Sequence, residues 1–143
     1  MKYTIYNPST GQIVSVFATE NNDVATLNLG DSSYIEGSFD DSFYIENGQA
    51  VAKPNDPSAE LIKYEFDYTT KTWQLNSVKT ETLIRLHRNA LLESVDSFNA
   101  IRFASLSDAQ KQELIDYRQA LLDVPQQSGF PINVEWPNKP TWL

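Results

Sequence analysis

The sequence predicts an α+β protein with N-terminal antiparallel β-hairpins or a meander, then a C-terminal αα-hairpin and an extended Pro-rich apolar tail. Three patterns predict this order: apolar residues alternate in the first half, the period becomes 3.6 from about residue 78, and prolines interrupt the pattern from residue 125. We therefore expect a β-rich domain over residues 1–76, a helical hairpin over 77–125 and an extended docking tail over 126–143.

The first strands are expected close to the N-terminus. Tyr3 and Ile5 alternate with polar residues, and the turn-forming stretch 7–11 precedes an apolar run at 13–17. Residues 20–23, Glu-Asn-Asn-Asp, are expected to form a loop.

Two further hairpins are predicted in the first half. Within residues 43–52 the loop is Asn47-Gly48, and an Asn-Gly pair suits a type I′ turn because both central residues need positive φ. A second alternation occupies residues 64–75, where we expect Trp73 to belong to the core.

Two helices joined by a loop near residues 100–106 should follow. The first has an apolar stripe of Leu83, Ala90, Leu91, Val95 and Phe98. The second should begin after Ser107, because its hydroxyl can cap the Gln110 N–H while the Gln110 side chain reaches back. Its stripe is Leu114, Tyr117 and Leu121, widened by Ile115, Arg118 and Leu122. Pro125 should stop this helix because it lacks an N–H.

The tail carries a strip of alternating apolar residues, Phe130, Ile132, Val134 and Trp136. The intervening prolines restrict such a strip to an edge strand or an extended segment. It can dock on the chain's own core or on another chain, and the pattern leaves both readings open. We expect Trp142 to be incompletely buried by its own fold and to be a partner contact.

Composition excludes several classes of protein. Among 143 residues with a net charge of -8, residues 1–77 carry 4 basic and 11 acidic side chains, and residues 78–143 carry 7 and 8. An acidic first half disfavours nonspecific binding to nucleic acid or anionic lipid. The absence of cysteine excludes disulfides, thiol catalysis and thiolate zinc sites. Without a signal peptide or a membrane-length apolar run, we expect a soluble protein in the cytoplasm.

No catalytic, cofactor or metal site is expected, and we interpret the chain as a non-enzyme. His87 is the only imidazole and is expected to pack or cap rather than to catalyse. Asp40-Asp41 lacks the spacing of a calcium loop. A P-loop, a nucleophile elbow and a dinucleotide fingerprint are also missing from the sequence.

The second half resembles a known family. Residues 85–96 read Arg-Leu-His-Arg-Asn-Ala-Leu-Leu-Glu-Ser-Val-Asp, residues 117–131 run from Tyr-Arg-Gln-Ala-Leu to Gly-Phe-Pro, and residues 136–140 read Trp-Pro-Asn-Lys-Pro. These motifs resemble the bacteriophage tail assembly chaperone domain family over roughly residues 80–140. The segment 97–103 departs from the family's usual loop. More weakly, Tyr-Ile-Glu at 34–36 and 44–46 resembles the β-rich leader of tail-fibre and tail accessory proteins.

The resemblance implies a role in building phage tails or fibres. One reading is a chaperone that binds a tail-fibre or other tail protein in the host cytoplasm. The alternative is a permanent component of the tail, baseplate or fibre attachment in the virion. Arg85, Arg88, Tyr117 and Arg118 either hold the two helices together or face a partner, and a homo-oligomer is compatible with either reading. The candidate partner-binding residues are Arg85, Arg88, Tyr117, Arg118, Phe130, Ile132, Val134, Trp136 and Trp142.

Overall fold

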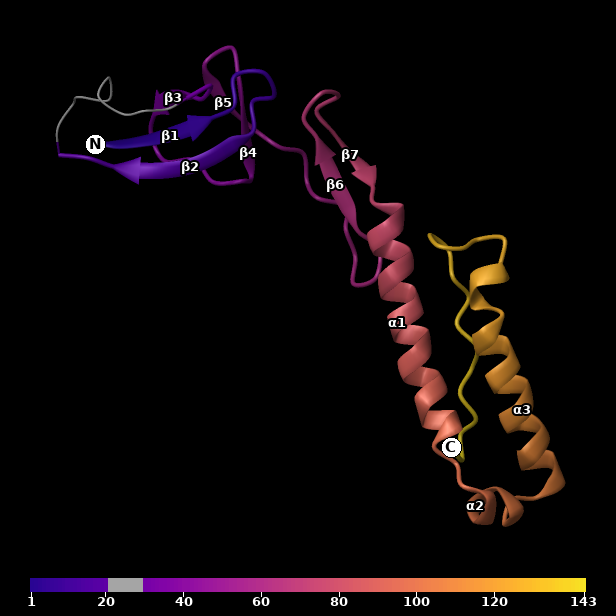
Figure 1. The fold of residues 1–143 in the computed structure, drawn as a ribbon. Helices are drawn as coiled ribbons and strands as arrows, with labels where there is room; N and C mark the ends of the chain where they lie inside the picture. Colours follow the sequence, from indigo (N-terminus) through magenta and orange to yellow (C-terminus); the bar gives the residue numbers. More distant parts are fainter. Residues whose placement is uncertain (21–29) are drawn as a thin grey trace. The chain divides into compact units, whose positions relative to one another are not determined.

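The computed structural model describes residues 1–20 and 30–143 and has the α+β architecture expected from the sequence (Figure 1). The chain forms two compact units. The first comprises residues 1–57 and 64–74, and the second comprises residues 58–63 and 75–143. Of the loop expected at 20–23, all but Glu20 lies outside the described residues.

The first unit contains an antiparallel sheet in which the central strand is β1 and the order is β2-β1-β3. Its strands are β1 (Lys2–Tyr6), β2 (Ile13–Ala18) and β3 (Ser33–Glu36). Thr4 is fully buried opposite Val16 on one side and Ile35 on the other. Its hydroxyl donates to the Gly37 carbonyl at 3.0 Å, so the buried polar group is satisfied.

The Asn-Gly hairpin is confirmed in the same unit. Strands β4 (Phe43–Glu46) and β5 (Gln49–Ala52) pair antiparallel, and Glu46 faces Gln49 across the turn. Asn47 and Gly48 have φ angles of 52° and 73°, the left-handed geometry that a type I′ turn requires.

A second hairpin packs its aromatic side chains within the first unit. It consists of β6 (Tyr64–Asp67) and β7 (Thr72–Leu75), the last residue of which belongs to the second unit. The Phe66 ring lies 5.6 Å from Tyr44 and 5.4 Å from Trp73. Trp73, expected in the core, is only half-buried, and its indole N–H donates to the Pro54 carbonyl at 2.8 Å.

The second unit is helical. Its elements are α1 (Ser77–Asp96), α2 (Ala100–Ala104), α3 (Asp108–Leu122) and the short 3-10 helix η2 (Val124–Gln126). The capping box of Ser107 and Gln110 is confirmed at the start of α3. The loop expected near residues 100–106 is wrong, because Asn99 caps a five-residue helix by accepting from the Arg102 N–H at 2.8 Å.

The core of this unit is formed where α1 faces α3. On α3 the buried residues are Leu114, Tyr117 and Leu121, as predicted. On α1 they are Thr80, Ile84, Leu92 and Val95, so the predicted stripe is partly wrong. The expected stripe is out of phase, since Ala90 is exposed and Leu92 is buried. Leu91 and Leu92 are both apolar, so either could lie on the packing face, and an error of one residue rotates the predicted stripe by 100°.

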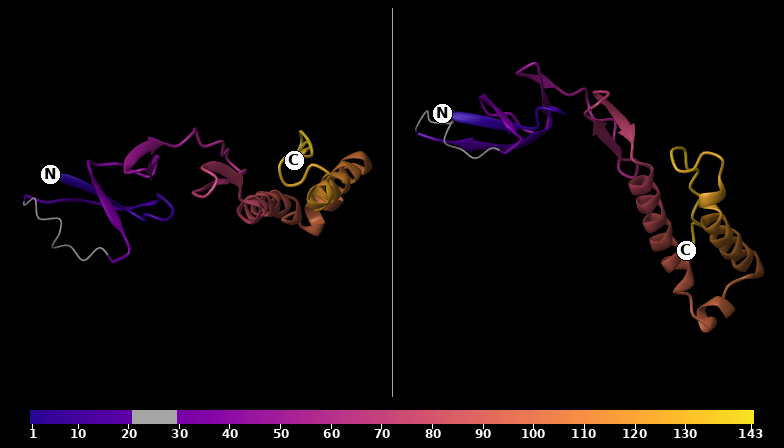
Figure 2. Two further views of the ribbon diagram at one scale, coloured as in Figure 1. Left: turned by 90° about the horizontal axis from the view of Figure 1, so that it is seen from above. Right: turned by 45° about the horizontal axis from the view of Figure 1, so that its top comes forward.

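Helix α3 ends at Leu122, before Pro125, which lies inside η2. The strand period expected at residues 130–136 is not realised as a strand. The chain instead reverses, with the Asn133 N–H donating to the Gly129 carbonyl at 2.7 Å, and continues without regular structure. Figure 1 and Figure 2 show this yellow segment running back along the helical hairpin. None of the helices described is long and apolar enough to cross a membrane.

Candidate partner-binding site

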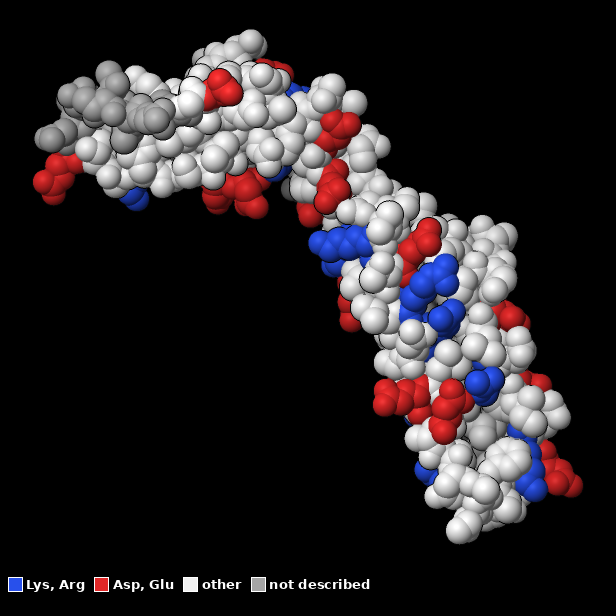
Figure 3. Space-filling view, in the orientation of Figure 1, with Lys and Arg blue, Asp and Glu red and all other residues white. Residues whose placement is uncertain are grey.

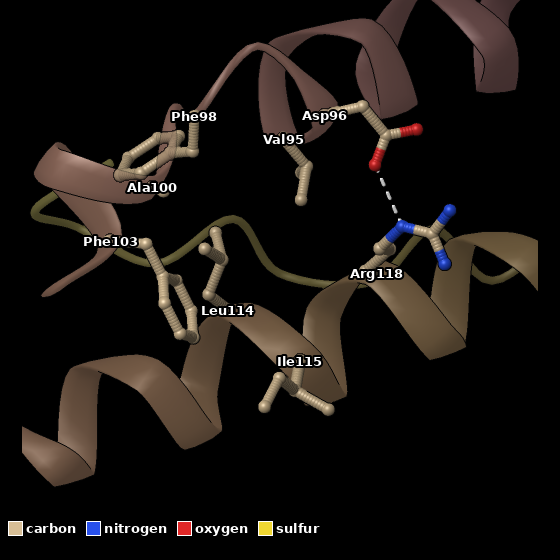
Figure 4. Close-up of a pocket in the computed structure, with 8 residues that line it drawn as sticks. All are labelled: Val95, Asp96, Phe98, Ala100, Phe103, Leu114, Ile115 and Arg118. Carbon is tan, nitrogen blue, oxygen red and sulfur yellow. Dashed lines mark hydrogen bonds and ion pairs between the residues drawn. The ribbon is translucent and has the colours of Figure 1, made fainter.

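The turn from α1 through α2 into α3 encloses an open apolar hollow, here called the corner groove (Figure 4). It has a volume of about 330 Å³. Its lining residues are Val95, Asp96, Phe98, Ala100, Phe103, Leu114, Ile115 and Arg118. Helix α2 creates the groove because it holds Phe103 across from α3 instead of letting the chain pass directly between the two long helices.

A charged pair forms one rim of the corner groove. Arg118 Nε lies 2.7 Å from Asp96 Oδ1, and this hydrogen bond raises the pKa of Arg118 above its usual value. Both side chains are about half exposed, at 46% and 50%, so screening by solvent keeps the contribution of the pair to stability small. Its main effect is to fix a polar edge beside the apolar floor.

Two side chains show that the corner groove is uncovered. Ile115 lines the groove with 51% of its surface exposed. Phe103 is only partly buried, with the Lys111 ammonium 5.7 Å from its ring centroid. An apolar hollow with a polar rim can receive an apolar side chain of another protein, because burial of that side chain releases water from both surfaces.

A second apolar hollow, here called the tail groove, lies beside α1. It has a volume of about 250 Å³. Its lining residues are Ala59, Glu60, Leu61, Ile62, Ile84, Pro131, Ile132, Val134 and Trp136. The segment 58–63 is held against α1 because the Lys63 N–H donates to the buried Thr80 hydroxyl at 3.0 Å. Residues within 131–136 of the tail also line this groove, so one of its walls is the chain's own tail.

The tail is attached to the helices by its two tryptophans. The Trp136 ring meets His87 edge-on at 4.7 Å, which gives His87 the packing role expected of it. The Trp142 ring meets Phe98 at 6.2 Å, and its indole N–H donates to Glu113 Oε2 at 2.6 Å. In this structure, the docking of the tail is on its own core, although both rings remain partly exposed.

Gln127 holds the reversal that precedes the docked segment. Its side-chain amide donates to the Glu135 carbonyl and accepts from the Glu135 N–H, both at 2.8 Å. This two-point contact replaces the ladder hydrogen bonds that an edge strand would have supplied, and it directs the chain toward α1.

The structure distributes the sequence-predicted residues over several places. Ile132, Val134 and Trp136 come together in the tail groove, whereas Arg118 lines the corner groove. Phe130 lies under the Arg85 guanidinium at 5.4 Å, and Arg85 also pairs with Glu81 at 3.8 Å.

Two further candidates are occupied by contacts within the helices. Arg88 bonds the Asn89 side chain through Nε and Nη2. Tyr117 is 5% exposed, and burial raises the pKa of its phenol. Tyr117 therefore acts as part of the core in this structure.

Sequence reasoning did not assign a partner-binding role to Val95, Phe98, Phe103 or Ile115. A helical stripe identifies the face that packs; Ile115 lies beside the stripe of α3, and Phe103 lies on the short helix α2. The signal available in the sequence is Ile115, an apolar residue next to the stripe of α3, which by itself indicates only a wider packing face. Among the described residues, no group of acidic or histidine side chains could hold a metal ion.

Residues 81–141 match the family model described as phage tail assembly chaperone protein. Over this region the chain is similar to the phage tail assembly chaperone family. The matched stretch contains the whole corner groove and the part of the tail groove formed by α1 and the tail. No curated protein and no solved structure matches the chain. The family supports a chaperone role in assembly of a bacteriophage tail.

Proposed function

We propose that this protein is a non-enzymatic assembly chaperone that binds an unassembled tail-fibre or other tail protein through its helical hairpin and tail. The supporting observation is the uncovered corner groove inside the region matched by the family. Charged residues of both signs surround the helical unit on the face seen in Figure 3, which suits reversible binding in water.

The corner groove fits an apolar or aromatic side chain from an extended or helical segment of the client. Unassembled tail components expose surface that is later buried, and such surface aggregates when it stays uncovered. The floor of the corner groove consists of valine, leucine and phenylalanine side chains, which can cover apolar client surface without a fixed pattern of hydrogen bonds. The rim pair of Asp96 and Arg118 favours one orientation of the client segment, because a charged group at the rim repels a group of like charge on the client.

Co-expression with the tail proteins of the same phage tests the site. Ile115→Asp places a carboxylate in the apolar groove and should reduce co-purification of the client by at least about tenfold, since the charge must be desolvated on binding. Ile101→Asp is the matched control, because Ile101 is 84% exposed on α2 and does not line the groove. Equal loss, or no loss, in both variants would contradict the assignment of the groove.

Folding is checked separately in each variant by circular dichroism and thermal melting. Ile115 is half exposed, so its substitution should leave the helical content unchanged. Ile115→Ala is a milder companion that removes apolar contact without adding charge, and it should weaken co-purification less than Ile115→Asp does.

The same surface could instead form a lasting joint in the tail, baseplate or fibre attachment. Mass spectrometry of purified particles distinguishes the two roles. A chaperone that acts in the host cytoplasm should be absent or far below stoichiometric amounts in mature virions, and stoichiometric presence would overturn the departing-chaperone proposal.

A further inference from the structure

The docked tail is held to the helices without a backbone ladder. Among the described residues, the only backbone–backbone hydrogen bond recorded for 134–143 is local, from the Leu143 N–H to the Pro140 carbonyl at 3.1 Å. Attachment to the helices is through side chains: those of Trp136 and Trp142 described above, and that of Leu143, which also packs against the core. A segment fastened only by side chains can leave its seat without breaking secondary structure.

The anchor points on the helices are also accessible. His87 and Glu113 are exposed, and both tryptophans are partly buried at the edge of the core. The seat, defined here as His87, Phe98 and Glu113, therefore persists as a surface of α1, its C-terminal turn and α3 when the tail is elsewhere. Its shape and chemistry match one known occupant, residues 134–143 of this chain.

The connection between the helices and the tail is long enough to reach another molecule. Val124 in η2 is fully buried and marks the end of the fixed helical body. The residues from 127 to 135 reverse through local contacts, those of Gln127 with Glu135 and of Asn133 with Gly129. Opened out, nine residues span up to about 30 Å.

We propose that two copies of this chain exchange their tails, so that residues 134–143 of one copy occupy the seat of the other. Exchange preserves every seat contact, because each tryptophan meets the same residues on the neighbouring copy. The costs are the entropy of association and the local hydrogen bonds of residues 127–135 that open. Exchange is therefore concentration-dependent, with a scale of about 1 mM for a short flexible connection.

Exchange makes the tail groove a composite site. Val134 and Trp136 then come from one copy, and Ile84 and residues 59–62 come from the other. The proposal goes beyond the proposed chaperone function and does not depend on it, because the corner groove contains no tail residue.

A complementation experiment with two full-length variants tests tail exchange. The first, Trp136→Ala with Trp142→Ala, keeps an intact seat and has a defective tail. The second, His87→Ala with Glu113→Ala, keeps an intact tail and has a defective seat. Their mixture should contain at least about tenfold more heterodimer, measured by native mass spectrometry, than the homodimer that either variant forms alone at the same concentration. A mixture without heterodimer would overturn the proposal. The same result is expected if the seat accepts only a segment of another tail protein.

The wild-type chain supplies an independent measurement if a variant fails to fold. Wild-type protein should form dimers at about 1 mM. Light scattering at increasing protein concentration should show the dimer fraction rising. Trp142→Ala, which removes one anchor from the tail, should lower that fraction severalfold. A strictly monomeric wild-type protein at that concentration would overturn the exchange.

Discussion

The indole N–H of Trp142 donates a 2.6 Å hydrogen bond to the Glu113 carboxylate and so joins the end of the tail to α3. The same ring packs edge-on against Phe98, which follows α1. A single side chain near the end of the sequence thus contacts residues from both arms of the helical hairpin. This contact makes the tail a stabilising part of the helical unit.

Replacing Glu113 with alanine should destabilise the helical unit slightly. The lost hydrogen bond has a charged acceptor, but Glu113 is exposed, so we expect a decrease of at most about 1 kcal/mol in the free energy of unfolding. Urea denaturation followed by Trp fluorescence measures it. Gln112→Ala is the control, since Gln112 precedes Glu113 on α3 and bonds Asp116 rather than the tail. If both variants behave alike, the Trp142 contact does not contribute to stability.

Removing the Trp136 ring should have a larger effect on the isolated protein. Burying a large aromatic side chain contributes about 3–5 kcal/mol relative to alanine, and Trp136 is only partly buried, so Trp136→Ala should cost about 2 kcal/mol. Calorimetry should show a lower Tm for the helical unit. Trp136→Phe keeps a ring beside His87 and should recover part of the loss. An unchanged Tm in Trp136→Ala, with loss only of client binding, would mean that the tail acts between molecules.

Local chemistry explains which elements could be predicted. Asn47-Gly48 specifies its turn because few other residue pairs accept two positive φ angles, and Ser107 with Gln110 specifies a helix start through two short-range hydrogen bonds. Helix α2 was missed because five residues give too short a periodic signal, and its formation depends on the Asn99 cap.

The tail and the corner groove depend on long-range packing. Alternation at residues 130–136 correctly indicated apolar contacts, but the reversal depends on the Gln127 side chain meeting the Glu135 backbone, which no residue pattern specifies. A groove is formed by apolar residues that the fold leaves uncovered. Ile115 and Leu114 are neighbours in sequence, and only the packing of α1 and α2 determines that one is exposed and the other is buried.

Tyr117→Phe should change the alkaline stability of the helical unit. Burial raises the pKa of the Tyr117 phenol above its ordinary value of about 10. A group with a raised folded-state pKa contributes stability that is fully present below the unfolded pKa and is lost as pH rises through the folded pKa. The wild-type protein should therefore lose stability above about pH 10 more steeply than Tyr117→Phe does. Thermal melts from neutral pH to pH 11 measure the difference, and parallel curves would contradict a raised pKa.

The first unit offers a matched pair of glycine substitutions. Gly11 and Gly48 have nearly equal φ angles of 74° and 73°, so alanine at either position incurs the left-handed penalty of about 1–2 kcal/mol. At Gly48 an added Cβ meets open space, whereas at Gly11 it would overlap the backbone oxygen of Ile45.

Gly11→Ala should therefore cost more than Gly48→Ala, by about 1–3 kcal/mol for the overlap. The Gly11 carbonyl accepts from the Ile45 N–H at 2.8 Å, so the backbone cannot move apart without weakening that hydrogen bond. Urea denaturation of the two variants provides the comparison, and Gly48→Ala serves as the control for backbone conformation. Equal destabilisation would show that Gly11 and Ile45 are farther apart in solution than in this structure.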